Sequence, residues 1–267
     1  MEPTRPRPPS EWTPWVVAPS SGFRVDDAAG EVALVQLTPS QFRVGTTFRF
    51  VDETLETELA AGLTARGLDA DLAAGRVTAA LTYWSTGEEP TDLASVPQFM
   101  RWFENAYGAH TLAAIIHDQL ITHEPNGGAL QSDIAADALF REMMRSAGVG
   151  FLKRWVMWAA VALRTRLVAG GARKLSVVVW IALALVGITT FVVGAVQTLR
   201  GDLGGVVVAA IALAVGLLAS LLWGRQVRAG LIAMVGGFFI VPAAAVAFLG
   251  LAAASAVSRA LGWLGLR

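Results

Sequence analysis

The C-terminal third of the chain is dominated by long apolar runs, whereas the first two thirds alternate between short apolar and polar segments. Ser176 to Leu199 contains 24 residues without an ionisable side chain, enough for a helix to cross a hydrocarbon core about 30 Å thick. Val206 to Trp223 and Leu231 to Leu251 repeat this pattern. Because backbone groups in lipid must be satisfied within a helix, we predict an all-α transmembrane block over residues 171–267 with three spans. The expected spans are about 176–199, 206–223 and 231–251.

The residues before this block predict an α+β domain over 22–170, in which short antiparallel strands come first and helices follow. β-Branched and aromatic residues from Val32 to Val51, interrupted by turn residues, indicate a hairpin or meander. Arg76 to Ser85 again has strand character. Helices are expected at Glu53 to Arg66, Gln98 to Ala106, Ala109 to Thr122, Gln131 to Ala147 and Phe151 to Val168.

Residues 1–21 carry six of the eleven prolines and show neither helical nor strand periodicity. Such a segment cannot bury enough apolar surface to offset the entropy of ordering it. We therefore expect a disordered, partly polyproline-like tail before the folded domain.

Charge is distributed unevenly along the chain. Residues 1–140 contain 8 basic and 19 acidic side chains, whereas residues 141–174 contain 8 basic and 1 acidic. The acidic first segment argues against a nucleic-acid partner, and the basic second segment suits contact with the lipids of an anionic membrane leaflet. Basic residues also gather in the segments before the first span and between the second and third. This bias predicts a multi-pass protein of the cell membrane whose N-terminal domain is cytoplasmic.

Histidine is rare and clustered, since His110, His117 and His123 lie within fourteen residues. The doublet formed by His117 and Asp118 interrupts an apolar helical run. A carboxylate in that setting is costly unless it is paired, hydrogen-bonded or metal-bound. Helical spacing turns His117 toward the apolar face and Asp118 toward Thr122, so His117 is expected to be at least half buried.

Three aspartates are candidate partners of this doublet: Asp92 in a loop, and Asp133 and Asp137 one turn apart on the next helix. In one interpretation, Asp92, His117, Asp118 and Asp137 bind a divalent metal ion or form an acid/base pair, with Asp92, His117 and Asp118 in catalysis. Imidazole and carboxylates are the usual ligands where cysteine is absent. In the other interpretation, the same side chains form a structural hydrogen-bonded network. The sequence leaves both open.

Three short patterns in this region resemble the phage and bacterial family known as domain of unknown function 1353. They are Thr91-Asp92-Leu93-Ala94-Ser95-Val96-Pro97, His117-Asp118 within an apolar helix, and Ala136-Asp137-Ala138-Leu139-Phe140. The resemblance extends over roughly residues 34–170 and implies a compact domain with an Asp-containing loop and a His-Asp helix, but no established activity. The chain departs from the family pattern where an aromatic residue usually follows the doublet. The segment from Glu53 to Arg76 and the membrane block are additions.

Two functions of different classes follow. A membrane-anchored protein with a metal-dependent hydrolase site would use the His/Asp cluster to activate water. A non-enzymatic membrane-anchored binding or assembly module, or an oligomeric pore-type effector, would use the cluster only for folding. Ala212, Gly216 and Ser220 recur at four-residue spacing, which suits either homo-oligomers through transmembrane helices or ordinary packing within one chain. The spans contain no charged residue, which argues against a transporter or selective channel.

Overall fold

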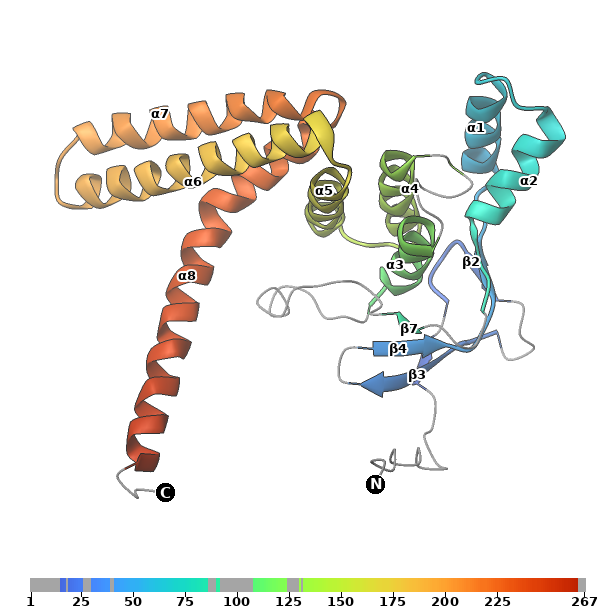
Figure 1. Cartoon of the computed structure of the whole chain (residues 1–267), viewed down its shortest axis with the longest axis horizontal. Helices are drawn as coiled ribbons and strands as arrows, with labels where there is room; N and C mark the ends of the chain where they lie inside the picture. Colours follow the sequence, from blue (N-terminus) through green and yellow to red (C-terminus); the bar gives the residue numbers. More distant parts are fainter. Residues whose placement is uncertain are drawn as a thin grey trace. The chain divides into compact units, whose positions relative to one another are not determined.

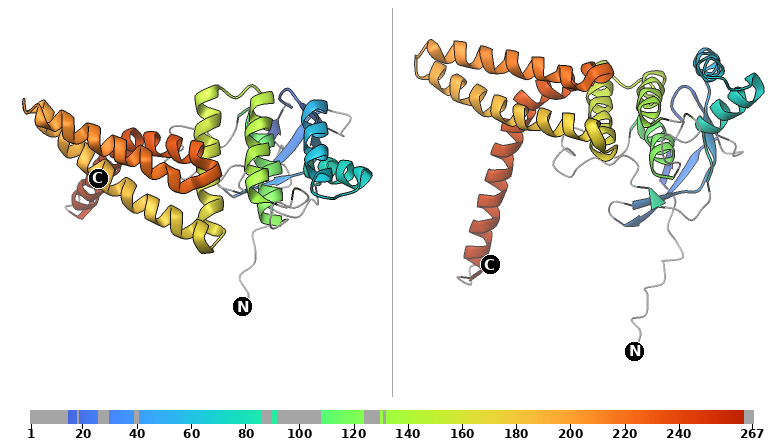
Figure 2. Two further views of the ribbon diagram at one scale, coloured as in Figure 1. Left: turned by 90° about the horizontal axis from the view of Figure 1, so that it is seen from above. Right: turned by 45° about the horizontal axis from the view of Figure 1, so that its top comes forward.

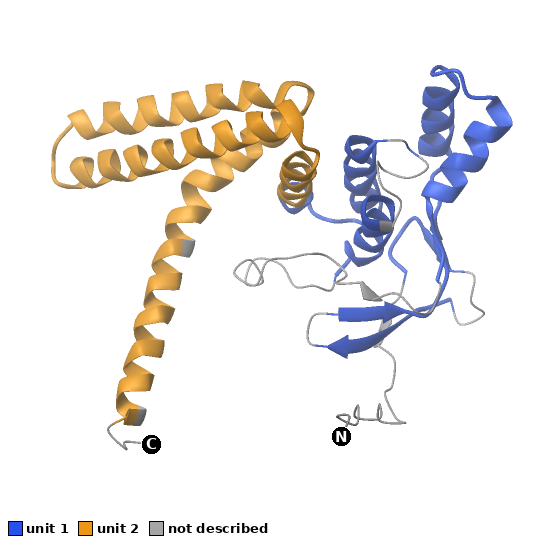
Figure 3. Ribbon diagram, viewed as in Figure 1, with its two compact units in different colours: residues 1–154 blue, residues 155–267 orange. Residues whose placement is uncertain are grey.

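The structure is a computed structural model that describes residues 15–17, 19–25, 30–38, 41–85, 90–91, 108–123, 130 and 132–263. The chain forms two compact units, residues 1–154 (unit 1) and 155–267 (unit 2), which are considered separately (Figure 3). The predicted boundary after Gly170 lies further along the chain than this division. The difference arises because the helix that precedes Gly170 packs with the helices that follow Gly170.

The strands of unit 1 form two antiparallel sheets. The first has the order β1-β3-β4-β7 and contains β1 (Trp15–Val17), β3 (Val32–Thr38), β4 (Gln41–Val44) and β7 (Pro90–Thr91) (Figure 1). The second has the order β2-β5-β6 and contains β2 (Phe23–Val25), β5 (Phe48–Phe50) and β6 (Thr82–Tyr83). The predicted hairpin is confirmed, since β3 and β4 pair antiparallel, with an irregular register between Gln36 and Thr38. Alternate residues of β3 to β5 are buried, as expected for sheets with one covered face.

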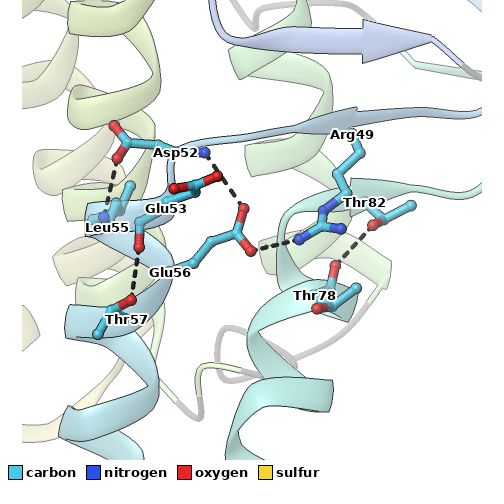
Figure 4. A network of polar contacts seen from close by, with 8 residues as sticks. All are labelled: Arg49, Asp52, Glu53, Leu55, Glu56, Thr57, Thr78 and Thr82. Carbon is cyan, nitrogen blue, oxygen red and sulfur yellow. Dashed lines mark hydrogen bonds and ion pairs between the residues drawn. The ribbon is translucent and has the colours of Figure 1, made fainter.

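Two short helices, α1 (Glu53–Thr64) and α2 (Ala70–Ala80), separate β5 from β6. Asp52 caps α1 by accepting a hydrogen bond from the Leu55 amide at 3.0 Å. Glu56 accepts from the Asp52 amide and pairs with Arg49 of β5 at 2.6 Å, which ties the start of the helix to the sheet (Figure 4). At the other end of α2, the Thr82 hydroxyl donates to the Thr78 carbonyl at 2.7 Å.

Two sequence predictions in this region were wrong. Residues 76–85 were expected to form a strand, but α2 continues to Ala80 and only Thr82–Tyr83 is extended. The Asp69 side chain accepts from the amides of Asp71 and Leu72, and this cap starts a helix that local β-propensity did not indicate. Residues 15–17 were assigned to an irregular tail, yet they pair with β3 from Trp15↔Leu34 to Val17↔Val32.

The remaining described residues of unit 1 are mainly helical, in agreement with the predicted order of strands followed by helices. Helix α3 (Thr111–Asp118) continues into a π-helical turn, η2 (Gln119–His123), and α4 (Asp133–Ser146) follows. The predicted helix over Gln98 to Ala106 lies outside the described residues. Buried side chains of α1, α3, η2, α4 and the strands form the core; they include Phe48, Phe50, Leu63, Leu112, Ile115, Ile116, Leu120, Leu139 and Met143.

Unit 2 contains most of α5 (Phe151–Val168), whose bounds match the prediction, and three further long helical elements. Helices α6 (Gly171–Leu199) and α7 (Gly204–Ala219) lie side by side as a hairpin (Figure 2). A 3-10 turn, η4 (Ser220–Gln226), then leads into α8 (Val227–Trp263). Gly224 interrupts this turn with φ +53°, which marks the point where the chain leaves α7.

The core of unit 2 lies at one end of the hairpin, where α5, η4 and the first part of α8 meet α6 and α7. It consists of Trp158, Ala159, Ala162, Val177, Trp180, Ala184, Ile188, Ala219, Trp223, Ala229, Met234 and Phe238. Beyond Phe238, the described side chains of α8 are exposed or partly exposed up to Trp263, and Pro242 lies within this stretch.

Two helical stretches of the described chain are long and apolar enough to cross a membrane. They are Gly171–Leu199, which is α6, and Gly204–Leu261, which joins α7, η4 and α8. In their most apolar windows only 33% and 28% of the residues are buried. The predicted three spans therefore correspond to two continuous helical stretches, the second divided at η4.

Candidate functional site

The His-Asp doublet lies at the end of α3, at the point where the helix widens into η2. Residues Thr111 to His117 are all buried, so the prediction that His117 is at least half buried is confirmed. Gln119 fixes this end to β6, because its side chain donates to the Thr82 carbonyl at 3.1 Å and accepts from the Trp84 amide at 3.2 Å. The doublet is thereby held against the second sheet. Single π-helical turns of this kind recur at functional sites.

His117 meets Asp137 of α4 across the core of unit 1. Its Nε2 lies 2.9 Å from Asp137 Oδ1, and the Asp137 side chain is fully buried. The imidazole ring also packs on Phe140, one turn further along α4, at a centroid distance of 5.0 Å. A carboxylate removed from water needs such a partner, and the contact fixes both the ring plane and the spacing of the two helices.

Asp118 faces elsewhere. It is half-buried, and its Oδ1 accepts a hydrogen bond from the Thr122 hydroxyl at 3.1 Å. Helical spacing predicted this direction for the side chain. Asp133, one turn before Asp137, has a buried Oδ1 with no hydrogen-bond partner in the described part of the chain. Asp133 and Asp137 are the two candidate partners of His117 that the structure describes, and of these Asp137 is in contact with His117.

The predicted metal-ligand set is assembled only in part. His117 and Asp137 are in contact, Asp118 points toward Thr122, and Asp92 lies outside the described residues. Within the described ranges, no three His, Asp or Glu side chains are grouped closely enough to bind a metal ion. The arrangement in view is a buried His/Asp pair, which can orient an imidazole but offers a cation two protein ligands.

A second polar cluster, in unit 2, was not predicted. Arg166 of α5 is buried among apolar side chains, and its Nε donates to Gln226 Oε1 at 2.7 Å. Its Nη2 donates to the Trp223 carbonyl, and its guanidinium lies 5.3 Å from the centre of the Trp223 ring. Burial lowers the pKa of Arg166, and the nearby positive charge of Arg173 lowers it further.

The sequence contained a signal for this cluster. Arg166 follows Ala159 and Ala162 at helical spacing, so it lies on the buried face of α5 rather than on the solvated one. The break at η4 supplies the partner, because the Trp223 carbonyl lies next to the non-helical Gly224. Backbone groups freed at a break between apolar helices must find another donor or acceptor, and Arg166 donates to this one.

The stripe of small residues on α7 is occupied within the chain. A side chain on Gly216 would meet Phe238 at 2.9 Å and Met234 at 3.1 Å, both on α8. The hydroxyl of Ser220 accepts from the Trp180 indole of α6 at 3.4 Å. Of the two alternatives for this stripe, the contacts favour ordinary packing within one chain.

Part of the chain matches a known protein family. Residues 82–161 match the family described as "Protein of unknown function (DUF1353)", and this confirms the resemblance seen in the sequence patterns. The match begins at β6 and ends within α5, so it contains His117 and Asp137 but is shorter than the predicted range of 34–170. Neither a curated protein nor a solved structure matches the chain.

Proposed function

We propose that this protein is a multi-pass membrane protein in which α6, α7 and α8 are three spans and unit 1 is held at the cytoplasmic face. The observation that carries the proposal is the exposure of large apolar side chains around these helices. Between Leu175 and Trp263, 28 such side chains of the described chain are exposed. The core helices of a soluble protein would be mostly buried, and soluble monomers rarely expose contiguous apolar patches larger than about 300–600 Å².

The orientation follows from the ends of the spans. Arg173 and Lys174 stand at the start of α6, and Arg225 and Arg228 lie at or beside η4, so both basic segments belong to one end of unit 2. The turn between α6 and α7, at the other end, contains one basic residue, Arg200, which is offset by Asp202. Short loops rich in Lys and Arg remain on the cytoplasmic side, which supports a cytoplasmic unit 1.

Cysteine labelling in intact cells tests this topology, and the absence of native cysteine gives a clean background. We expect a membrane-impermeant maleimide to label Asp202→Cys and Arg259→Cys from outside. Lys174→Cys and Arg225→Cys should react only after the cells are opened. Labelling of positions 174 and 202 from the same side would overturn the assignment of α6 as a span.

Within this framework we assign unit 1 the role of a non-enzymatic binding or assembly module. The supporting observation is that His117 and Asp137 use each other as partners in the core, where they hold α3 against α4. Removing either side chain should then lower the stability of unit 1 without altering metal content. Metal analysis of the purified full-length protein and its His117→Ala variant, alongside thermal unfolding, tests this role.

A metal-dependent hydrolase is the second candidate, favoured by the direct contact between two of the four proposed ligands. Carboxylates that orient an imidazole are common around metal sites. In this alternative Asp92, His117, Asp118 and Asp137 bind a divalent cation that activates water, with Asp92, His117 and Asp118 in catalysis. It requires that the wild-type protein bind a divalent ion, and that Asp92→Asn and Asp118→Asn both abolish binding while the fold is retained. A protein that binds no such ion would rule it out.

Homo-oligomers through the transmembrane helices also remain part of the proposal. The occupied stripe on α7 directs such contacts to the outward faces of α6 and α7, where Leu185 and Leu218 are 56% and 65% exposed. Cross-linking through cysteines at these two positions in native membranes should produce dimers or larger species. A chain that remains monomeric at both positions would refute the oligomer and, with it, an assembled pore.

A further inference from the structure

Unit 2 carries a strong imbalance of charge at one end. Six basic residues gather where α5 and α6 meet η4: Arg164, Arg166, Arg173, Lys174, Arg225 and Arg228. The contact between Arg166 and Gln226 brings the α5 side and the η4 side of this basic end together, and Arg173 is close enough to act on Arg166 electrostatically. All but Arg166 are exposed.

Unit 2 has no acidic residue that could neutralise this basic end. The only carboxylate side chain between residues 155 and 267 is Asp202, beyond the far end of α6. With a rise of about 1.5 Å per residue, Lys174 and Asp202 are separated by roughly 40 Å, several times the screening length of about 8 Å in physiological salt. The compensating negative charge must therefore come from outside unit 2.

The interior of the basic end is also rich in hydrogen-bond donors. Arg166 has only neutral acceptors among the contacts described, the Trp223 carbonyl and the Gln226 side chain. Two further donors, Gln226 Nε2 and Trp223 Nε1, are buried without a hydrogen-bond partner among the described residues. Gly224, between these two residues, is exposed, and apart from its chain neighbours no atom of the described residues lies within 4 Å of the position that a side chain on it would occupy. Unused donors and positive charge together call for an anionic acceptor.

We propose that this basic end of unit 2 binds the phosphate group of an anionic phospholipid in the cytoplasmic leaflet. The inference rests on the proposed membrane topology, since that topology brings η4 and the start of α6 to the headgroup level. Indole and guanidinium groups are suited to this level, where one side of the site is apolar and the other is wet. A lipid is preferred over a soluble anion because exposed apolar side chains lie close in sequence to these basic residues, among them Leu175, Leu221 and Leu222.

Native mass spectrometry of the full-length protein in detergent tests the proposal directly. The protein is titrated with equal mixtures of phosphatidylglycerol and phosphatidylcholine, and retained lipids are counted. We expect a preference of at least tenfold for phosphatidylglycerol. The double variant Arg173→Gln/Arg225→Gln should abolish this preference, because each basic residue near an anionic surface contributes about a fivefold effect and two together contribute about 25-fold.

The matched control is Arg200→Gln/Arg259→Gln, which removes the same charge from exposed positions outside the basic end. It should leave the preference unchanged, and an equal loss would overturn the localisation. Thermal protection by inorganic phosphate as strong as that by phosphatidylglycerol would show a free-anion site and refute the lipid assignment. If labelling confirms the spans but no lipid preference appears, this proposal fails while the membrane topology stands.

Discussion

The buried pair of His117 and Asp137 predicts a large and local loss of stability when one partner is removed. In Asp137→Ala the imidazole loses its partner in a site from which water is excluded, and α4 loses a side chain with no exposed surface. Breaking such a pair costs about 3–5 kcal/mol, whereas Asp137→Asn, which keeps the shape and one acceptor, should cost about 1 kcal/mol.

Hydrogen exchange of the full-length protein in detergent, read by mass spectrometry, reports this loss on the helices concerned. Peptides from α3 and α4 should exchange at least about 100-fold faster in Asp137→Ala, because 1.4 kcal/mol corresponds to a factor of ten. Peptides from α6 and α7 serve as the internal reference and should be unchanged. The double variant His117→Ala/Asp137→Ala should lose about 0.5–3 kcal/mol less stability than the sum of the losses in the two single variants.

The matched control is Asp118→Asn, which alters the neighbouring carboxylate that is half-buried and bonded to Thr122. Its cost should be below about 1 kcal/mol, as expected for a hydrogen bond open to water. Unchanged exchange of α3 and α4 in Asp137→Ala, or strict additivity with His117→Ala, would show that the pair does not hold the two helices together.

Three further changes test the packing of the described chain. Arg166→Leu should lower the unfolding free energy by about 1–3 kcal/mol, because the Trp223 carbonyl loses its donor; near-UV circular dichroism would detect this, and Arg166→Lys should restore part of the loss. Gly194→Ala should cost about 1–3 kcal/mol, since the new methyl group would lie 2.7 Å from the Ala209 amide nitrogen, whereas Gly250→Ala, in open space, should leave the melting temperature unchanged. Asp69→Ala should cost about 1 kcal/mol by removing the cap of α2, and faster exchange confined to α2 would confirm it.

Helices with a strong local signal were predicted well, and contacts between distant residues were not. The bounds of α5 and the start of α1 at Glu53 match the prediction, because apolar periodicity and the Asp52 cap are local features. Helix α2 was missed because Val77, Thr78, Thr82 and Tyr83 have β-propensity, while the Asp69 cap and the alanines that follow it decide the outcome. Strand β1 depends on its distant partner β3, which no local pattern indicates.

The sequence predicted which residue types form the candidate site, but it did not predict which aspartate pairs with His117. The need of a buried carboxylate for a partner is elementary chemistry, and Asp137 was one of three candidates. Selecting it requires the packing of α4 on α3, which places Asp137 and Phe140 around the imidazole. Arg166 was expected only as one of the basic residues between 141 and 174 that suit contact with lipid. Its burial depends on the break at η4, and a helix break within apolar residues is not visible in periodicity.

If α8 spans a membrane as proposed, its length has a consequence for the surrounding bilayer. Its 37 residues extend about 55 Å, almost twice the hydrocarbon thickness of about 30 Å. The tilt needed to fit the whole helix would exceed the 0–40° usual for membrane helices. Pro242 offers the relief, because it cannot donate to the carbonyl one turn earlier, and helices bend at such points. The 21 residues that follow it are about 32 Å long and carry few contacts to the rest of the bundle, so they can adjust their angle as membrane thickness changes.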